Sequence, residues 1–434
     1  MFYSPGSATR WVKVFFASAA LIAFACASSM AITSSYYGGD LDTYSMLSSF
    51  LGVLHGGVYV PSRFTGYPVA EFGIGFLAWL GGSSLSNIVT FLLYVASVII
   101  FPFCLQKQPS FGVYLAFVAL AITSPVLVFD NIQSMDYSWG LFFWVAGTFA
   151  LVRFGSKELF IIFNALAIGS RPSFALFAAA SLYGFASFGG ALSVKSGLQD
   201  WRPILLFTTF FSGGLFYLPN WLIHRFSLSW IAAASSDFMG AHGLLARIFY
   251  KGLLSIGFAQ SCLLILAFAW LGLKLVRSIS LIRLRYLISE FCKQNRFLLL
   301  VVIFNLCIFV KIPHEVSYLQ PGLLAFYWLL CAFFSSSCVW ILVSLVILNL
   351  LNWFVEPQIL DITYRDASLC GAKQAIAAKP SRSLKPGRIH QYLEVEKKKL
   401  SCYSPGFQSL GGADLVDAVS RGMPLRLANP DLNK

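Results

Sequence analysis

Long runs of apolar residues, separated by short polar stretches that contain Gly and Pro, fill the first 354 residues of the chain. A bilayer core about 30 Å thick is crossed by roughly 20 helical residues, so a run near that length predicts a transmembrane helix. The pattern predicts an all-α, polytopic membrane protein with about 11 spans joined by loops. The expected spans are 11–33, 85–104, 111–129, 137–153, 158–170, 172–189, 203–222, 252–275, 297–313, 317–333 and 338–354.

The segment 66–82 departs from this pattern, because it is apolar but contains Glu71. It offers only about 14 residues before its Gly pair, too few for a comfortable span. If it crossed the bilayer, the basic cluster within 274–296 would face outwards, whereas Lys and Arg favour the cytoplasmic side. We therefore expect an interfacial or re-entrant helix at 66–82, with the N-terminus inside and the loop 34–82 outside. The run 11–33 could instead be a cleaved signal sequence, which leaves the same loop outside.

The first outer loop contains the sequence GGDLDTYSMLSSFLGVLHGG, in which apolar residues recur at helical spacing from Tyr44 to Leu54. This spacing predicts an amphipathic helix that lies on the membrane surface. Asp40 or Asp42 would cap that helix, because a carboxylate accepts hydrogen bonds from the free N–H groups at a helix start. Alternatively, one of the two removes a proton from a hydroxyl group or holds a divalent cation.

Composition supports a membrane protein with a different C-terminal part. Hydrophobic residues make up 58% of the chain and charged residues 11%, against about 25% charged residues in soluble domains, which excludes an ordinary soluble globule. The tail 355–434 nevertheless holds 20 of the 49 charged residues. We expect a membrane domain at 1–354, followed by a polar, basic and partly disordered tail at 355–434 on the outer side.

The formal net charge of +13 raises the question of nucleic-acid binding, but Lys and Arg outside the tail lie singly or clustered between apolar runs. That distribution fits membrane topology, so no nucleic-acid partner is expected. The nine cysteines form no CxxC pair and indicate neither a zinc site nor a disulfide scaffold. The sequence lacks a GxxxxGK[ST] loop and a GxSxG motif, so no nucleotide cofactor is expected.

Acidic residues and histidines of the membrane domain gather on the outer side of this topology, which favours a functional site at the outer interface. Arg63 would be a snorkelling interfacial residue or a phosphate ligand. Arg171, which precedes Pro172, would be a snorkelling cation in a turn or a phosphate ligand as well. Asp130 and Asp136 bracket one loop, as solvated loop ends or as residues that shape the site.

The last outer loop, KIPHEVSYLQP, places Lys311, His314, Glu315 and Tyr318 within eight residues. A cation and a histidine here would neutralise a lipid phosphate, while Glu315 would orient the histidine or bind a metal ion. A polar structural turn is the alternative. The His-Glu pair lacks the second histidine of a zincin motif.

Taken in order, the motifs GGDLDTY, RFTGYP, MDYSWGLFFW, GSRPS and HEVSYLQP resemble those of the multispanning GT-C glycosyltransferases. The likeness is closest to bacterial members that use polyprenyl-phosphate sugars, including relatives of the protein mannosyltransferases and aminoarabinose transferases. It covers roughly residues 10–354 in order and spacing. The resemblance implies a helical membrane enzyme that takes an activated sugar from a lipid carrier.

The family carries an Asp-Glu-x-x-Tyr motif in its first outer loop. Here Asp40 and Tyr44 keep the separation, but Leu41 stands at the second acidic position and Asp42 follows one residue later. The resemblance therefore gives the role of general base to Asp40 first and to Asp42 second. The Lys-x-Pro and Tyr-Leu-x-Pro elements of the family match Lys311, Pro313, Tyr318, Leu319 and Pro321.

The resemblance implies that Asp40 deprotonates an acceptor hydroxyl group as it attacks the anomeric carbon, so the anomeric centre is inverted. Arg63, Arg171, Lys311 or His314 would stabilise the departing phosphate. Whether a divalent cation takes part is open. The residues expected to shape the site are Tyr44, Asp130, Asp136, Glu315 and Tyr318.

The expected partners are a polyprenyl-phosphate sugar donor, a lipid, glycan or protein acceptor, and membrane lipids. The resemblance favours a bacterial inner membrane, with the active face towards the periplasm. A transporter or lipid-linked glycan flippase is an alternative, because spans broken at Gly and Pro also fit alternating access. A polymerase of lipid-linked glycans and a non-catalytic scaffold are further alternatives.

Overall fold

The computed structural model of the protein describes residues 8–38, 41–57, 59–62, 66–105, 110–184, 201–223, 248–249, 252–253, 255–278, 281–311, 316–334, 338–364, 376–386, 418–419 and 421–425. Up to residue 354, the described residues form helices joined by short turns, and each expected span contains a helix. The helices are α1 Ala8–Thr33, α2 Leu41–Gly56, α3 Pro68–Ile100, α4 Phe111–Thr123, α5 Pro125–Asn131, α6 Asp136–Phe149, α7 Lys157–Ser170, α8 Phe174–Tyr183, α9 Trp201–Leu215, α10 Leu218–Ile223, α13 Phe258–Ser278, α14 Leu281–Gln294, α15 Arg296–Lys311, α16 Gln320–Phe334 and α17 Val339–Phe354, with short elements at Phe101–Cys104, Ala150–Phe154 and Val316–Leu319.

Several of these helices are long and apolar enough to cross a membrane. Within the described part of the chain, three qualify alone, Arg10–Thr33, Pro68–Cys104 and Val316–Phe334, and up to five qualify if each of two bent pairs is one span. The expectation of about 11 spans is therefore not confirmed. The expected span 111–129 is divided by a bend of 63° between α4 and α5, and the apolar helices Phe174–Tyr183, Phe258–Lys274 and Val339–Phe354 have only 10–17 residues. The second bend, of 83°, lies between α14 and α15.

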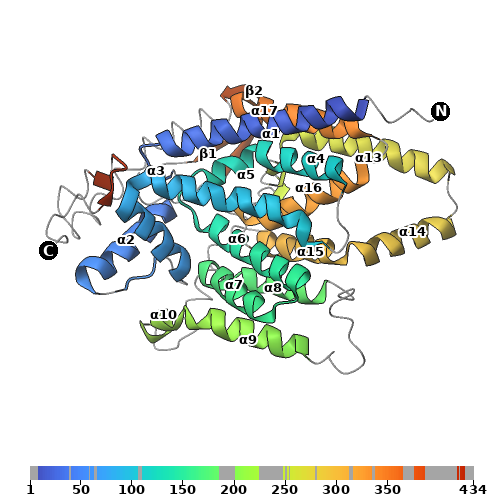
Figure 1. The fold of residues 1–434 in the computed structure, drawn as a ribbon. Helices are drawn as coiled ribbons and strands as arrows, with labels where there is room; N and C mark the ends of the chain where they lie inside the picture. Colours follow the sequence, from blue (N-terminus) through green and yellow to red (C-terminus); the bar gives the residue numbers. More distant parts are fainter. Residues whose placement is uncertain are drawn as a thin grey trace.

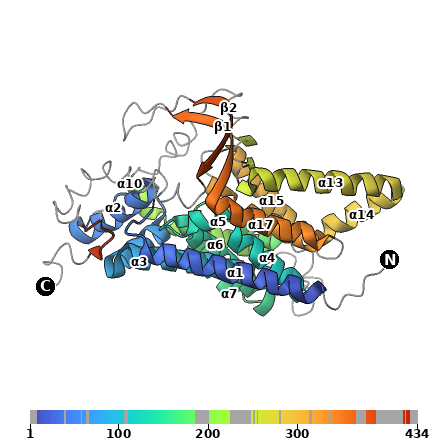
Figure 2. The same cartoon turned by 90° about the horizontal axis from the view of Figure 1, so that it is seen from above.

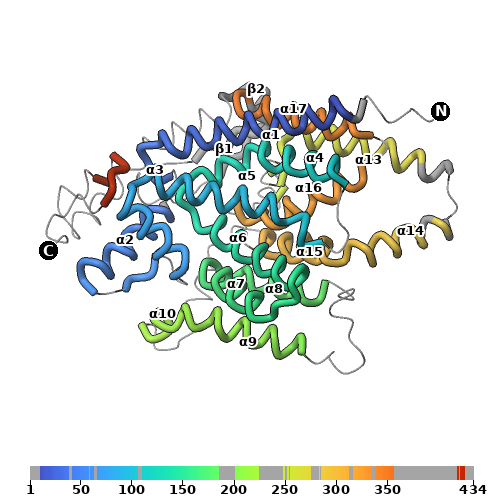
Figure 3. Tube along the Cα trace, viewed as in Figure 1, coloured from blue at the N-terminus to red at the C-terminus, as the bar shows by residue number. Residues whose placement is uncertain are grey.

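The helices form an elongated bundle (Figures 1 and 3). In Figure 1, α1 and α17 lie along one edge, α6, α7 and α8 lie in the middle, and α9 lies along the opposite edge. Helix α2 and helix α10 lie at one end of the bundle, whereas α14 and the start of α1 lie at the other. The basic residues between 274 and 296 belong to α13, α14 and the start of α15, so they lie far from α2.

The break between α4 and α5 follows from Pro125, which has no N–H group and so leaves the carbonyl oxygen of Ala121 without its helical donor. The hydroxyl group of Tyr94 donates to that oxygen at 2.7 Å. Just before the break, the carbonyl oxygen of Thr123 accepts a hydrogen bond from Nε1 of Trp353 at 2.9 Å. Neighbouring helices thus supply the partners that the proline removes, as a break inside a membrane bundle requires.

Three buried amides from α13 and α17 complete this region. Gln260 donates through Nε2 to Oδ1 of Asn349 at 3.1 Å and accepts at Oε1 from Nδ2 of Asn352 at 3.3 Å. Asn349 in turn donates to Oγ1 of Thr123 at 3.3 Å. We call these residues, with Trp353, the α4–α17 network.

The segment 66–82 is helical, as expected, but it is continuous with the next apolar run in one helix, α3. Pro68 stands in the first turn, where a missing N–H group costs nothing. The two halves meet at Gly82, whose φ of +70° and ψ of −159° interrupt the helical backbone. A residue with a side chain rarely adopts this conformation, so the glycine permits the break.

Buried apolar residues form two clusters. The larger one fills the bundle around Trp144, whose Nε1 donates to the carbonyl oxygen of Phe177 at 3.0 Å. The smaller one, which we call the end cluster, joins α2, the first half of α3 and the start of α6 with two residues of the tail. Its members are Tyr37, Tyr44, Met46, Leu47, Leu51, Tyr67, Ala70, Ile74, Ala78, Met135, Tyr137, Val419 and Leu425.

The tail adds strands to the helical part of the protein. Strands β1 Val355–Tyr364 and β2 Ile376–Pro386 pair antiparallel, with an irregularity between Gln358 and Leu360. The all-α class expected from the sequence therefore describes the part of the structure up to residue 354. Figure 2 shows the ribbon of β1 and β2 extending away from the bundle beyond α17.

A second part of the tail returns to the break in α3. The carbonyl oxygen of Gly422 accepts a hydrogen bond from the backbone N–H group of Ser83 at 2.9 Å, and that of Met423 accepts from the Tyr37 hydroxyl group at 3.1 Å. Gly82 and Gly422 both have positive φ, and a Cβ atom added to Gly82 would collide with the carbonyl oxygen of Gly422. Two glycines are therefore needed for the tail to dock here.

Candidate functional site

The turn between α7 and α8 directs Arg171 into the protein. Pro172 disfavours a helical conformation in the residue before it, and Arg171 is extended, with φ of −162° and ψ of 121°, at the end of α7. The side chain is only 2% exposed. Arg171 is therefore buried, and the expectation of a snorkelling cation at this turn is wrong.

Arg171 lies beside one carboxylate and between aromatic rings. Its Nη1 atom lies 3.1 Å from Oδ2 of Asp136, which is fully buried at the start of α6. The guanidinium carbon lies 3.7 Å from the ring centre of Tyr137, 4.2 Å from that of Tyr318 and 5.5 Å from that of Tyr67. These distances permit cation–π attraction, which grows when the cation is removed from water.

The ion pair leaves hydrogen-bonding capacity unused. Neither terminal nitrogen of Arg171 and neither carboxylate oxygen of Asp136 makes a hydrogen bond within the described part of the chain. A guanidinium group carries five N–H donors in a planar fork, which suits phosphate and carboxylate groups. A buried donor without a partner is unusual in a folded protein and calls for an explanation, such as a bound ligand.

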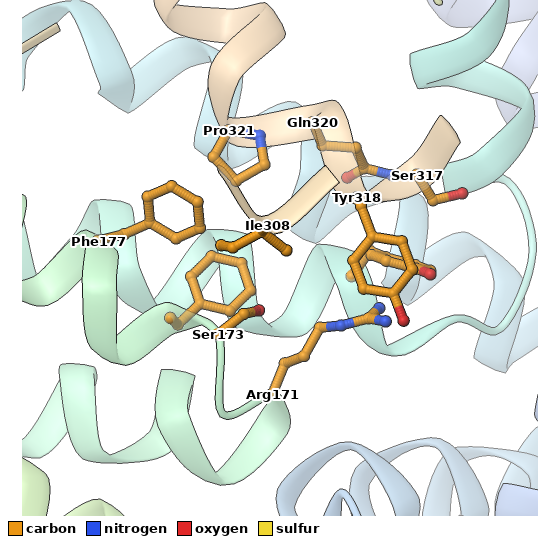
Figure 4. A pocket seen from close by; sticks show the side chains of 10 residues that line it. Arg171, Ser173, Phe177, Ile308, Ser317, Tyr318, Gln320 and Pro321 are labelled. Carbon is orange, nitrogen blue, oxygen red and sulfur yellow. The ribbon is translucent and has the colours of Figure 1, made fainter. Parts of the chain in front are cut away.

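Arg171, with Tyr137 and Tyr318 beside it, lines a pocket, shown in Figure 4. Gln320, the first residue of α16, also lines the pocket, although it is far in sequence from the α7–α8 turn. Neither its amide oxygen nor its amide nitrogen has a hydrogen-bond partner among the residues described. The lining residues are Tyr137, Arg171, Ser173, Phe174, Phe177, Ile308, Ser317, Tyr318, Gln320 and Pro321. The pocket thus combines a buried cation, aromatic rings and an amide, a mixture typical of sites for polar ligands.

Asp130 reaches the edge of this pocket through Ser317. Its Oδ2 atom accepts a hydrogen bond from Oγ of Ser317 at 2.7 Å. Asp130 lies in α5 and Ser317 precedes α16, so the contact joins two segments far apart in the sequence. Asp130, Asp136, Arg171 and Tyr318, all expected at the site from the sequence, are therefore brought together.

Helix α2 reaches the residues around Arg171 through the end cluster. Tyr44 is buried in the end cluster together with Tyr67 and Tyr137, the rings that flank Arg171. Tyr318 packs against this cluster, and its ring meets that of Tyr137 edge to face, with centroids 5.7 Å apart. Asp42 lies in the first turn of α2, where its charge also complements the helix dipole.

Lys311 is the last residue of α15 and is exposed. Ile308, three residues earlier, lines the pocket, so Lys311 lies one helical turn further along the same side. Four other residues expected at the site lie outside the described residues: Asp40, Arg63, His314 and Glu315.

Glu71 has a structural role that the sequence did not reveal. It is fully buried and accepts hydrogen bonds from the Tyr59 hydroxyl group at 2.6 Å and from the backbone N–H groups of Ser62 and Tyr67, both at 3.0 Å. Burial and the charge of Glu71 raise the pKa of Tyr59, so this hydroxyl group stays protonated and donates. Glu71 therefore ties residues 59–62 to the start of α3.

The sequence also gave no indication of Gln320 or of the pairing of Asp136 with Arg171. A signal for Glu71 exists in retrospect, since an acid in the first turn after a proline can bond the N–H groups of the preceding loop. Gln320 is unusual only because its side chain has no hydrogen-bond partner among the described residues, and this can be known only from the tertiary structure. Among the described residues, no group of three or more His, Cys, Asp or Glu is placed to hold a metal ion.

Fold and site together define a helical protein with several apolar helices of membrane-spanning length and a mainly apolar pocket that contains a buried cation and a buried amide. Comparison with models of known protein families, with curated proteins and with solved structures finds no match for the chain. Its function must therefore be argued from the site itself.

Proposed function

We propose that this protein is a membrane glycosyltransferase that transfers a sugar from a polyprenyl-phosphate donor to a hydroxyl acceptor at the extracytoplasmic face. The observation that carries the proposal is the buried guanidinium group of Arg171, whose two terminal nitrogens make no hydrogen bond in the described structure. Charge-assisted hydrogen bonds from such a group to a phosphate are among the stronger polar contacts in proteins. A phosphate oxygen is therefore the partner that best completes this site.

The charge balance of the pocket fits a singly charged phosphate. Asp136 compensates the charge of Arg171, since the two groups lie 3.1 Å apart. A sugar-bearing lipid phosphate carries one negative charge, which would require a further cation close by. Lys311 lies one turn beyond the pocket-lining residue Ile308, and Arg63 and His314 are expected on the same side of the membrane from the sequence.

The position of the pocket suits a lipid-linked substrate. Two of its lining residues, Tyr137 and Tyr318, pack in or against the end cluster to which α2 contributes, whereas the basic helix α14 lies at the end of the bundle opposite α2 (Figure 1). Because clusters of Lys and Arg favour the cytoplasmic side, this arrangement supports an extracytoplasmic site. The polyprenyl chain would lie along the apolar helices while its phosphate reaches Arg171.

In the proposed reaction, Asp40 takes the proton of an acceptor hydroxyl group, and the resulting oxygen attacks the anomeric carbon. The bond between that carbon and the phosphate oxygen breaks, and the electron pair leaves with the phosphate. Arg171 stabilises the charge that develops on the leaving group. Attack opposite the leaving group inverts the anomeric centre. Asp42, in the first turn of α2, is the second choice for the base.

The test is transfer of label from a panel of radiolabelled polyprenyl-phosphate sugars by the purified full-length protein in membranes, with a crude acceptor extract. We expect transfer by the wild type and none by Asp40→Asn, whereas Asp42→Asn costs less. Asn caps a helix as well as Asp does, so a folded but inactive Asp40→Asn protein separates the base from the cap.

If the Asp40→Asn variant transferred sugar at the wild-type rate, Asp40 would not be the general base. No transfer by the folded wild type from any donor would count against the transferase and favour a lipid flippase or transporter, to be tested next by lipid translocation in vesicles.

The broken pair α4–α5 is the observation that favours a transporter, since such proteins bind substrates at discontinuous helices. At this break, however, the amides of Gln260, Asn349 and Asn352 are already occupied by one another and by Thr123. Arg171, by contrast, keeps two charged donors without a hydrogen-bond partner in the described residues. The transferase is therefore the better reading of the site.

A further inference from the structure

Gln320 is a buried amide whose hydrogen-bonding atoms are both unused. The residue is 1% exposed, and neither Oε1 nor Nε2 has a partner among the residues that the structure describes. A primary amide offers two N–H donors and a carbonyl acceptor, and burying them unpaired is unfavourable. A protein gains nothing from this arrangement unless something else supplies the partners.

The fold does not need Gln320 to hold the turn before α16, because Asn305 of α15 does so. Nδ2 of Asn305 donates to the carbonyl oxygen of Tyr318 at 2.5 Å, and its Oδ1 accepts from the backbone N–H group of Gly322 at 2.8 Å. One buried amide therefore braces the backbone on both sides of Gln320. The side chain of Gln320 is left for another purpose.

The position of Gln320 indicates that purpose. Gln320 and Arg171 line the same pocket although they come from different elements, and Figure 4 shows both side chains extending towards Tyr318. Ser317, which lines the pocket beside them, donates to Asp130. Of these polar groups, Arg171 provides charge and Gln320 provides a neutral donor and acceptor.

We infer that Gln320 binds the sugar headgroup of the donor, with Nε2 donating to a sugar or ester oxygen and Oε1 accepting a hydrogen bond from a sugar hydroxyl group. This inference rests on the proposed function and names a residue that determines specificity. A site built to hydrogen-bond a hydroxyl group rejects a ligand that lacks it, because the buried polar atoms are then left unpaired. Gln320 thus distinguishes the sugar-bearing lipid phosphate from the bare lipid phosphate that remains after transfer.

The experiment measures binding of a short-chain prenyl phosphate, bare and as its mannosyl, glucosyl and aminoarabinosyl esters, to purified full-length protein. We expect the wild type to bind one of the sugar esters more tightly than the bare phosphate. Gln320→Leu should bind the bare phosphate as the wild type does but lose at least about tenfold in affinity for that ester, the effect of one hydrogen bond of roughly 1.4 kcal/mol. Gln320→Glu should weaken both ligands, because it places a negative charge beside the phosphate.

Thermal unfolding of the ligand-free protein provides a readout that does not depend on activity. Leu has nearly the volume of Gln and no polar atom, so Gln320→Leu should unfold at the wild-type temperature or above it. Asn305→Leu is the matched control, since it removes two backbone hydrogen bonds and should lower that temperature.

A lower unfolding temperature for Gln320→Leu would show that the amide supports the fold, and the inference would fail. An unchanged preference for the sugar ester in Gln320→Leu would overturn the inference while leaving the transferase in place. If the wild type bound no prenyl phosphate at all, the proposed function would fail, and the assignment of Gln320 with it.

Discussion

Two groups of buried polar side chains in this protein differ in how completely their hydrogen bonds are made. In the α4–α17 network, each of the three amides donates or accepts within the network, at 3.1 to 3.3 Å. At the pocket, the lining residues Arg171 and Gln320 and the ion-pair partner Asp136 all carry polar atoms without a hydrogen-bond partner in the part of the chain that is described. Both groups are buried, so solvent does not explain the difference.

On the proposed function, the comparison separates polar residues that serve the fold from polar residues that would serve a ligand. The network compensates the helix break at Pro125, and removal of any member would leave another member unpaired. The pocket residues compensate nothing in the backbone, because Asn305 already braces the turn before α16. Substitutions in the network should therefore reduce stability, and substitutions in the pocket should reduce binding and transfer.

The largest effect is expected at the ion pair. Arg171→Met leaves Asp136 buried and unpaired, which should cost about 3–5 kcal/mol of stability. Arg171→Met combined with Asp136→Asn removes both charges, so most of the stability should return, while transfer stays at least about 100-fold below the wild type. Thermal unfolding and initial transfer rates measure the two effects. A double variant that transfers at the wild-type rate would show that the pair is structural.

In the α4–α17 network we expect a smaller effect, which lowers the stability of the protein and leaves its transfer activity unchanged. Asn349→Leu removes the partners of Gln260 and Thr123 and should destabilise the protein by about 1–3 kcal/mol, the cost of unpaired buried groups. Transfer per folded molecule should not change. Gln294→Leu is the control, because Gln294 is exposed on α14, and it should alter stability by less than about 0.5 kcal/mol. Loss of transfer in folded Asn349→Leu protein would contradict the division between the two groups.

The docked tail tests whether the end cluster supports the pocket. Gly82→Ala should cost about 1–3 kcal/mol, since the added Cβ strains a positive φ and collides with Gly422. Gly422→Ala disturbs the same contact, so the double variant should lose less than the sum of the two. Gly272→Ala in α13, where the added Cβ meets nothing within 4 Å, should be neutral or slightly stabilising. Chemical denaturation in detergent checks this series, and strict additivity would argue against the docked tail.

The smallest effect is expected where the pocket meets α5. Ser317→Ala removes the hydrogen bond to Asp130 and should cost about 1 kcal/mol. Because Ser317 lines the pocket, the affinity for a prenyl phosphate should change with it by a few fold at most. Calorimetric binding and thermal unfolding provide the measurements. A loss as large as that of Arg171→Met would mean that Ser317 contacts the ligand directly.

Much of the helical framework could be read from the sequence, because an apolar run in a polytopic protein has few alternatives to a helix. Each expected span contains a helix, and the helix expected after Asp42 is α2. The number of membrane-crossing helices could not be read, since the bend after Thr123 divides a run that looks continuous and several other apolar helices have only 10–17 residues. Composition averages over such bends, whereas a bend depends on which neighbouring side chains satisfy the freed backbone groups.

The candidate site was predicted in part. Asp130, Asp136, Arg171 and Tyr318 were expected near one another from their common side of the membrane, and they meet around one pocket. The burial of Arg171, the capture of a loop by Glu71 and the unpaired amide of Gln320 were not foreseen. Each of these depends on contacts between segments that are distant in the chain.

The sequence by itself determined that the chain is apolar, helical and charged unevenly along its length, because these are properties of composition and local spacing. Only the tertiary structure decided which polar groups are paired and which are free. Hydrogen bonding between distant residues depends on distances of about 3 Å, which no local pattern specifies. For that reason the framework could be derived from the residues in order, whereas the division between the α4–α17 network and the Arg171 pocket required the packed helices.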